Sequence, residues 1–250
     1  MVVSNILLHP APSKSEVKRC GEMIRQVVYE DLHAQPADLE RAIAVISWFR
    51  AQHAYPMSKI RYGLQSMLRT ENADEVVSQR LKRIPRIIRK LQRTVGSPTG
   101  RTALSRLEDI GGVRAILRDG VELERVRRRV ERNWKSSYLR EPRDYIANPK
   151  PIGYRAVHLI VGRDERAIEV QLRTRGQQEW ADAAEVADAR LAHREVNLKD
   201  SEGPVEMLEY FAAAGDFIYH SEYGLPIPDE MRARFKAARE SVIRGGYYAR

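Results

Sequence analysis

The alternation of apolar and polar residues is strictest near the middle of the chain, where it predicts two neighbouring β-strands, residues 153–161 and 167–174. The second strand alternates three apolar residues with three polar ones: Ile168, Val170 and Leu172 with Glu169, Gln171 and Arg173. A repeat of two places these sets on opposite faces of a strand. A half-buried strand with a solvated outer face is the ordinary explanation. A carboxylate, an amide and a guanidinium in one row would also suit a metal ion, a base edge and a phosphate.

Apolar residues at helical spacing predict helices over most of the remaining chain. One helix is expected from Asp38, which can cap it, to before Pro56, and the next begins near residue 58. The segment 73–93 carries an apolar stripe and a separate arginine stripe, and Pro85 is expected to kink or break it. Further helices are predicted over residues 15–32, 121–134, 177–194, 204–221 and 228–244, and a loop over 96–106.

This order of elements favours an α+β fold. Strands in the middle, helices on either side and no strict strand–helix alternation are typical of a mixed β-sheet covered by helices. We expect an N-terminal helical arm at residues 1–37, a central domain at 38–200 and a C-terminal helical extension at 201–250.

Composition restricts the class of protein. The 250 residues are 43% hydrophobic and 31% charged, as expected of a soluble globular protein. The single cysteine, Cys20, excludes an internal disulfide framework and a cysteine-based zinc site. The chain has neither a membrane span nor a signal peptide by sequence, so we expect it in the cytoplasm. The net charge of +9 suits anionic partners, either nucleotides or RNA, without choosing between them.

Three motifs follow one another in the central part. They are Asp109-Ile110-Gly111-Gly112-Val113-Arg114, then Tyr145-Ile146-Ala147-Asn148-Pro149-Lys150 with Gly153-Tyr154-Arg155 and His158, and finally Glu169-Val170-Gln171-Leu172-Arg173-Thr174 with Trp180-Ala181. In this order and spacing they resemble the synthetase domain of the RelA/SpoT family of pyrophosphokinases, over roughly residues 40–195. No histidine is followed by the aspartate of the family's hydrolase domain, so the resemblance is to a small stand-alone alarmone synthetase.

The resemblance implies a nucleotidyltransferase-like synthetase fold and a Mg²⁺-dependent reaction. The family transfers pyrophosphate from ATP to the 3′-hydroxyl of GDP or GTP and so makes (p)ppGpp. The aspartate that matches Asp109 holds the metal, and the glutamate that matches Glu169 assists metal binding and activates the acceptor. Carboxylates, together with phosphate oxygens, are the ligands that Mg²⁺ prefers.

Nucleotide contacts are implied in the same way. The residues that match Arg80, Lys82 and Lys90 hold ATP, and Tyr154 would stack on the guanine of the acceptor. Lys150, Arg155 and His158 would contact the acceptor's phosphates. The remaining members of the expected binding set are Arg114, Gln171 and Arg173.

The chain departs from the family pattern at several positions. Arg86 stands where the family has a serine, Ile152 replaces an asparagine, and the segment after Trp180 lacks a histidine and has its glutamate, Glu185, displaced by one. These changes leave open a degenerate relative with weak or no nucleotide binding. The basic stripe and the net charge leave open a toxin-type enzyme that pyrophosphorylates the 3′ end of tRNA. A homo-oligomer formed through the terminal helices is compatible with the resemblance.

Overall fold

A single five-stranded sheet lies at the centre of the protein. The computed structural model describes residues 10–29, 34–73, 76–93, 103–191, 198 and 201–247. The strands are β1 (Val76–Leu81), β2 (Gly111–Leu117), β3 (Arg143–Asp144), β4 (Val157–Arg163) and β5 (Arg166–Thr174), in the spatial order β1-β2-β5-β4-β3. Only the pairing of β2 with β5 is parallel, so the sheet is mixed. The predicted α+β class is confirmed.

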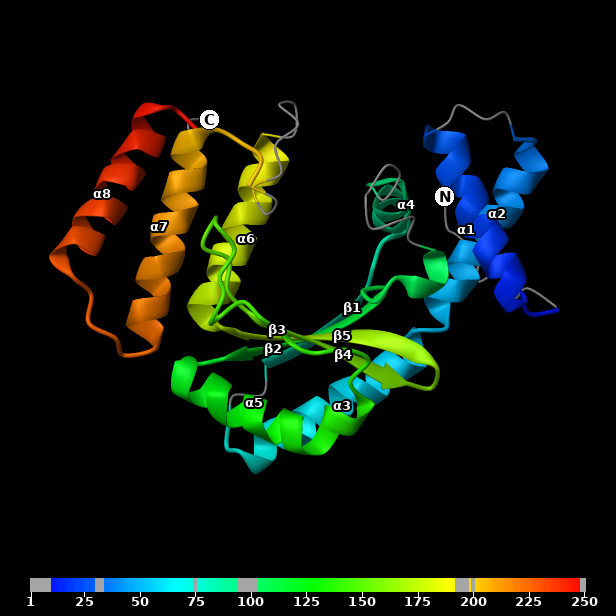
Figure 1. Cartoon of the computed structure of the whole chain (residues 1–250), viewed down its shortest axis with the longest axis horizontal. Helices are drawn as coiled ribbons and strands as arrows, with labels where there is room; N and C mark the ends of the chain where they lie inside the picture. The colour runs from blue at the N-terminus through cyan, green and yellow to red at the C-terminus, as the bar shows by residue number, and fades with distance from the viewer. Residues whose placement is uncertain are drawn as a thin grey trace.

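Two helices cover one face of this sheet, α3 (Ala54–Thr70) and α5 (Gly120–Trp134) (Figure 1). The apolar positions of the alternating strands point toward them. Ile168, Val170 and Leu172 of β5 are fully buried and share one core cluster with Leu64 of α3 and Val126 of α5. The alternation seen in the sequence therefore separates a buried face from a polar one.

The N-terminal elements form a second core at one side of the sheet. It joins α1 (Lys14–Tyr29), α2 (Pro36–Ala51), α4 (Ile84–Arg93) and the short 3₁₀ helix η1 (Leu104–Arg106) (Figure 1). Ile110, just before β2, is fully buried in the same cluster. The start of β2 is thus fixed from two directions, by the sheet and by the N-terminal helices.

A third core lies at the opposite side and joins α6 (Arg175–Arg190), α7 (Val205–Glu222) and α8 (Asp229–Arg244) (Figure 1). Thr174 and Gln177 form a capping box that starts α6 directly after β5. The indole Nε1 of Trp180 donates to the carbonyl oxygen of Phe211 at 2.8 Å, which ties α6 to α7. No helix of the described ranges is long and apolar enough to cross a membrane.

One predicted helix is wrong. Residues 73–93 do not form a continuous helix, because Val76–Leu81 is an edge strand that pairs antiparallel with β2, and only Ile84–Arg93 is helical. Pro85 lies in the first turn of α4, where its missing N–H costs no hydrogen bond. Smaller differences are that α2 begins at Pro36, with Gln35 as its N-cap in place of Asp38, and α3 begins at Ala54. The predicted ends at residues 30–32 and 192–194 lie outside the described residues, as does most of the 96–106 loop.

Candidate functional site

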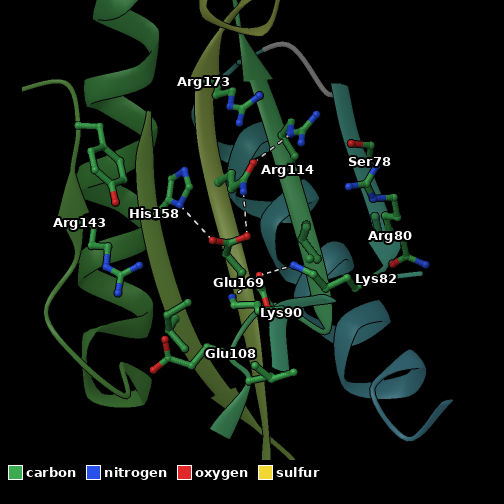
Figure 2. Close-up of a pocket in the computed structure, with 18 of the residues that line it drawn as sticks. Ser78, Arg80, Lys82, Lys90, Glu108, Arg114, Arg143, His158, Glu169 and Arg173 are labelled. Atoms are coloured by element: carbon green, nitrogen blue, oxygen red, sulfur yellow. Dashed lines mark hydrogen bonds and ion pairs between the residues drawn. The ribbon is translucent and has the colours of Figure 1, made fainter. Parts of the chain in front are cut away.

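The polar face of the sheet forms the floor of a cavity of about 760 Å³. It lies on the face that α3 and α5 leave uncovered, and Figure 2 shows its side chains converging from β1, β2, β4 and β5. Nine lysine and arginine residues and four carboxylates are among the described residues that line it. A cavity with this excess of cations suits a polyanionic ligand. Of the residues expected from the sequence, it contains Arg80, Lys82, Lys90, Asp109, Arg114, Lys150, Tyr154, His158, Glu169, Gln171 and Arg173.

Asp109 lies two residues before β2, between two lysines. Its Oδ2 accepts from Lys82 Nζ at 2.5 Å and from Lys90 Nζ at 2.6 Å (Figure 2). Burial raises the pKa of this carboxyl, but the charges of Lys90 and Lys82 outweigh it and lower the pKa below its ordinary value. The other oxygen, Oδ1, is buried and has no hydrogen-bond partner among the described residues. Asp109 is therefore an ionised carboxylate, and its Oδ1 makes no hydrogen bond to the described residues.

Glu169 stands on β5, the parallel neighbour of β2, and has a different environment. It lies 3.0 Å from His158 Nδ1 and accepts from Gln171 Nε2 at 2.8 Å, while Gln171 Oε1 accepts from Arg114 Nε at 3.2 Å (Figure 2). Burial raises the pKa of Glu169, but its hydrogen bond to His158 and the nearby imidazole outweigh this and lower the pKa. This carboxylate is also held ionised, with an imidazole and an amide as its partners in place of lysines.

Tyr154 continues this hydrogen-bonded row. Its hydroxyl lies 2.6 Å from His158 Nε2 and accepts from Arg173 Nη2 at 2.8 Å. The imidazole of His158 therefore bridges Glu169 and Tyr154 through its two nitrogens. Burial raises the pKa of Tyr154, and Arg173 opposes the rise without cancelling it.

The ring of Tyr154 is only 6% exposed and packs edge-on against Tyr145 and Trp180. The expected stacking of Tyr154 on a base therefore stays a prediction. Tyr145, which also lines the cavity, is less deeply buried and offers a second aromatic ring there.

Arg155 is not among the described residues that line the cavity, unlike the other expected contacts. Its Nη2 donates to Asp216 Oδ1 at 3.0 Å, its Nη1 donates to the carbonyl oxygen of Ile146 at 2.8 Å, and its guanidinium covers the ring of Tyr219. The expected phosphate contact is corrected accordingly: Arg155 fastens the 146–155 loop to α7.

The residues that depart from the family pattern lie in different surroundings. Arg86 is exposed on α4, and Ile152 is 2% exposed in the core formed by α6, α7 and α8. Neither is among the described residues that line the cavity, so neither side chain obstructs it. Glu185, the glutamate displaced by one, does line the cavity from α6.

Several lining residues were missed by the sequence analysis. They come from β1, from β2 and the segment before it, from the segment around β3, and from β4: Ser78, Gln79, Arg106, Leu107, Glu108, Gly112, Val113, Arg140, Arg143, Tyr145 and Ile160. Arg140 pairs with Glu108, another lining residue, at 2.8 Å. The basic pair Arg140 and Arg143, just before the Tyr145 motif, was the one signal that could have identified part of this set.

The carboxylates fit a divalent cation. No cluster of three or more histidine, cysteine or acidic side chains that could hold a metal occurs within the described part of the chain. A full protein cage for a metal is therefore not present there. An orphaned oxygen of Asp109 and the ionised Glu169 in one cavity match the sparse protein ligation of Mg²⁺, which takes further oxygens from phosphates and water.

Part of the chain is similar to known proteins. Residues 79–194 match a family model described as "Region found in RelA / SpoT proteins". The GTP pyrophosphokinase of Haemophilus influenzae is 36% identical over 121 residues, which cover 48% of this chain and 15% of that protein. GTP pyrophosphokinase YwaC of Bacillus subtilis is 30% identical over 124 residues, which cover 46% of this chain and 59% of that protein. The chain thus spans less than two thirds of either relative.

Solved structures show the same fold. The small alarmone synthetase 2 from Bacillus subtilis superposes with a TM-score of 0.53 at 21% identity, over 67% of this chain and 90% of that one. The small alarmone synthetase 1 from the same organism, bound to its product pppGpp, gives a TM-score of 0.51 at 20% identity, over 78% of this chain and 93% of that one. The expected synthetase-type fold is confirmed.

Proposed function

We propose that the chain, whose residues 79–194 match the family model of a region found in RelA / SpoT proteins, transfers the pyrophosphoryl group of ATP to the 3′-hydroxyl of GDP or GTP and makes (p)ppGpp. The observation that carries the proposal is the convergence of Asp109 and Glu169, both ionised, with a ring of lysine and arginine side chains in one cavity. Transfer of a charged phosphoryl group depends on positioning and charge stabilisation, and this cavity offers both.

Lys82 and Lys90 would hold the phosphates of ATP. Both ammonium groups lie beside Asp109, at 2.5 and 2.6 Å from its Oδ2. A cation that occupies the free side of Asp109 would compete with the lysines for this carboxylate, and a triphosphate would offer them new partners. The two lysines and the single aspartate leave one positive charge in excess, which a triphosphate would take up. Arg80 is exposed on the edge strand β1 and would add a further contact to the phosphates of ATP.

Mg²⁺ is proposed as the metal, with Asp109 and Glu169 as its protein ligands. When bound, it would neutralise charge on the transferred phosphates. What the chain itself supplies is the two carboxylates, Asp109 two residues before β2 and Glu169 on β5, which line one cavity.

Glu169 is the proposed proton acceptor. The 3′-oxygen of the acceptor attacks the β-phosphorus of ATP. The bond from that phosphorus to the α,β-bridging oxygen breaks, and AMP leaves with this oxygen. The hydroxyl proton passes to a Glu169 carboxylate oxygen, which is held ionised at neutral pH. His158 and Gln171 fix the orientation of this carboxylate from two sides.

A guanosine acceptor is supported by the names of the relatives: two are GTP pyrophosphokinases, and the small alarmone synthetase 1 was solved with its product pppGpp. The test is incubation of the purified chain with γ-labelled ATP and Mg²⁺, with GDP, GTP and deacylated tRNA as separate acceptors. We expect label on a guanosine nucleotide, and no transfer to any acceptor would contradict the proposal.

A second candidate function is transfer to the 3′ end of tRNA. The observation that favours it is a row of exposed arginines, Arg83 just before α4 and Arg86 and Arg89 on it, close in sequence to the proposed ATP-binding lysines. Such a basic face suits a nucleic-acid backbone. Label on tRNA alone in the same assay would establish this function in place of the first.

A further inference from the structure

A second cavity, of about 280 Å³, lies between α1 and η1, outside the site described above. Its described lining residues are Lys18, Gly21, Glu22, Arg25, Ala103, Ser105 and Arg106. Three of them are cations and one is an acid. The four residues from α1 recur at intervals of three and four, so they share one face of that helix.

Arg25 is the unusual member of this set. Its side chain is only 4% exposed, its Nη2 donates to Glu22 Oε1 at 2.7 Å, and its Nε is buried with no hydrogen-bond partner among the described residues. A buried guanidinium with an unmet donor is costly. Glu22, with 42% of its side chain exposed, compensates the charge only in part. A ligand with several acceptor oxygens would satisfy the remaining donor.

The walls of the cavity are held in place by close packing. A Cβ atom on Gly21 would lie 2.8 Å from the Cβ atom of Leu104, so the absence of a side chain lets η1 approach α1. Leu104 is 1% exposed. The cavity is therefore a fixed feature of the junction between these two elements, and Ser105 adds a hydroxyl to its cationic lining.

Arg106 connects this cavity to the larger one, because it lines both. It stands three residues before Asp109, and the intervening Leu107 packs in the same core as Val17 and Ile24 of α1. A ligand between α1 and η1 would therefore contact the segment that positions the proposed metal-binding carboxylate.

We propose that the cavity between α1 and η1 is a second binding site for a phosphate-class anion, either a free phosphate or pyrophosphate ion or the phosphate of a small nucleotide. Lys18, Arg25 and Arg106 would share its oxygens, as clustered cations do at phosphate sites. The site is separate from the proposed transfer reaction and does not depend on it.

The test is calorimetric titration of the whole chain with pyrophosphate, in parallel with inorganic phosphate and AMP. Because the larger cavity also binds anions by this account, two bound anions per chain are expected for the unaltered protein. Lys82→Ala should weaken the event at the larger cavity, because it removes a charged hydrogen bond. Lys18→Glu should weaken the event at the α1–η1 cavity by roughly tenfold or more, because it replaces a cation by an anion that repels the ligand.

Arg19→Glu is the matched control, because Arg19 is the exposed neighbour on the same helix and is not among the described lining residues. It should leave both binding events intact. Arg25→Lys keeps a positive charge at the buried position, and Arg25→Gln removes it. The first variant should therefore bind the anion more tightly than the second, and this comparison tests the buried charge itself. Stronger binding of AMP than of the inorganic ions would identify a nucleotide ligand, and the reverse a free anion. Equal binding by Lys18→Glu and Arg19→Glu would overturn the proposal.

Discussion

At the scale of single residues, the two carboxylates of the larger cavity have different partners and so different expected roles. Asp109 is held by two lysines and keeps an unpaired oxygen, whereas Glu169 is oriented by His158 and Gln171. A cation is best placed on the unpaired oxygen of Asp109, and Glu169 is the proposed proton acceptor because His158 and Gln171 fix its orientation.

Glu169→Gln should lower the rate of pyrophosphoryl transfer by about 100-fold or more while leaving the fold intact. The amide keeps the volume and the hydrogen bond to His158 but can neither accept the proton nor bind a cation well. Steady-state transfer to GDP measures the effect, and circular dichroism checks the fold. Glu165→Gln, an exposed glutamate in the turn before β5, is the control. An unchanged rate in Glu169→Gln would assign the proton transfer to another group.

Asp144 gives a pH-dependent prediction at the start of the 145–156 loop. It accepts from the backbone N–H groups of Ile146 and Ala147 and from Arg127 Nη1 at 2.7 Å. Burial raises its pKa, but the Ala147 N–H and Arg127 outweigh this and lower it below 3.8. A lowered folded pKa means that the carboxylate stabilises the protein above the unfolded pKa, and that this is lost as pH falls through the folded pKa.

Asp144→Asn should therefore lower the free energy of unfolding at pH 7 by about 1 kcal/mol, a value reduced for solvent screening. The difference from the unaltered protein should shrink as the pH falls below about 4. Urea unfolding at several pH values measures this. A difference independent of pH would show that Asp144 acts through geometry alone.

At the scale of elements, α7 supports the loop that carries the Gly-Tyr-Arg motif. Gly153 has a φ of +83°, and its backbone lies against α7 so closely that a Cβ atom on Gly215 would overlap the Gly153 carbonyl group. Asp216, the next residue on α7, binds Arg155 and also Arg234 of α8. The C-terminal helices thus support the loop that carries Tyr154, through its neighbours Gly153 and Arg155.

Gly215→Ala should destabilise the protein by roughly 1–3 kcal/mol, because the backbones of α7 and the loop must separate. It should also raise the KM for the guanosine acceptor more than the KM for ATP, since ATP is expected at the opposite side of the cavity. Thermal unfolding and initial rates measure these effects. Ser221→Ala, at an exposed position of the same helix, should change neither. Equal changes in both KM values would contradict a loop-specific effect.

At the scale of the whole molecule, the sequence predicted the sheet's centre better than its edge. The alternation of β5 and the order of the three motifs identified two of the four carboxylates and six of the nine cations among the described residues that line the cavity. β1 was predicted as helix because its alternation is weak, with four of its six residues exposed, and because the basic pattern of α4 follows at once. Arg155 was misplaced because a motif shows which residues are near a site but not which way each side chain points.

The net charge of +9 and the cation-rich cavity predict that ATP affinity depends on salt. Raising the ionic strength from about 0.1 to 1 M shortens the Debye length from roughly 10 to 3 Å and should weaken ATP binding several-fold. Calorimetry at several salt concentrations measures this. Lys82→Ala should show both weaker binding and a shallower salt dependence, and an equal dependence in the two proteins would exclude Lys82 as a phosphate contact.

The central claim is that the β- and γ-phosphates of ATP move together as one group. The most direct measurement uses ATP labelled separately at the β- and γ-phosphorus, with GDP as acceptor and Mg²⁺ present. The account predicts that both labels enter the guanosine product in equal amounts and that one AMP appears for each product molecule. Transfer of the γ-label alone, with ADP as the second product, would contradict it.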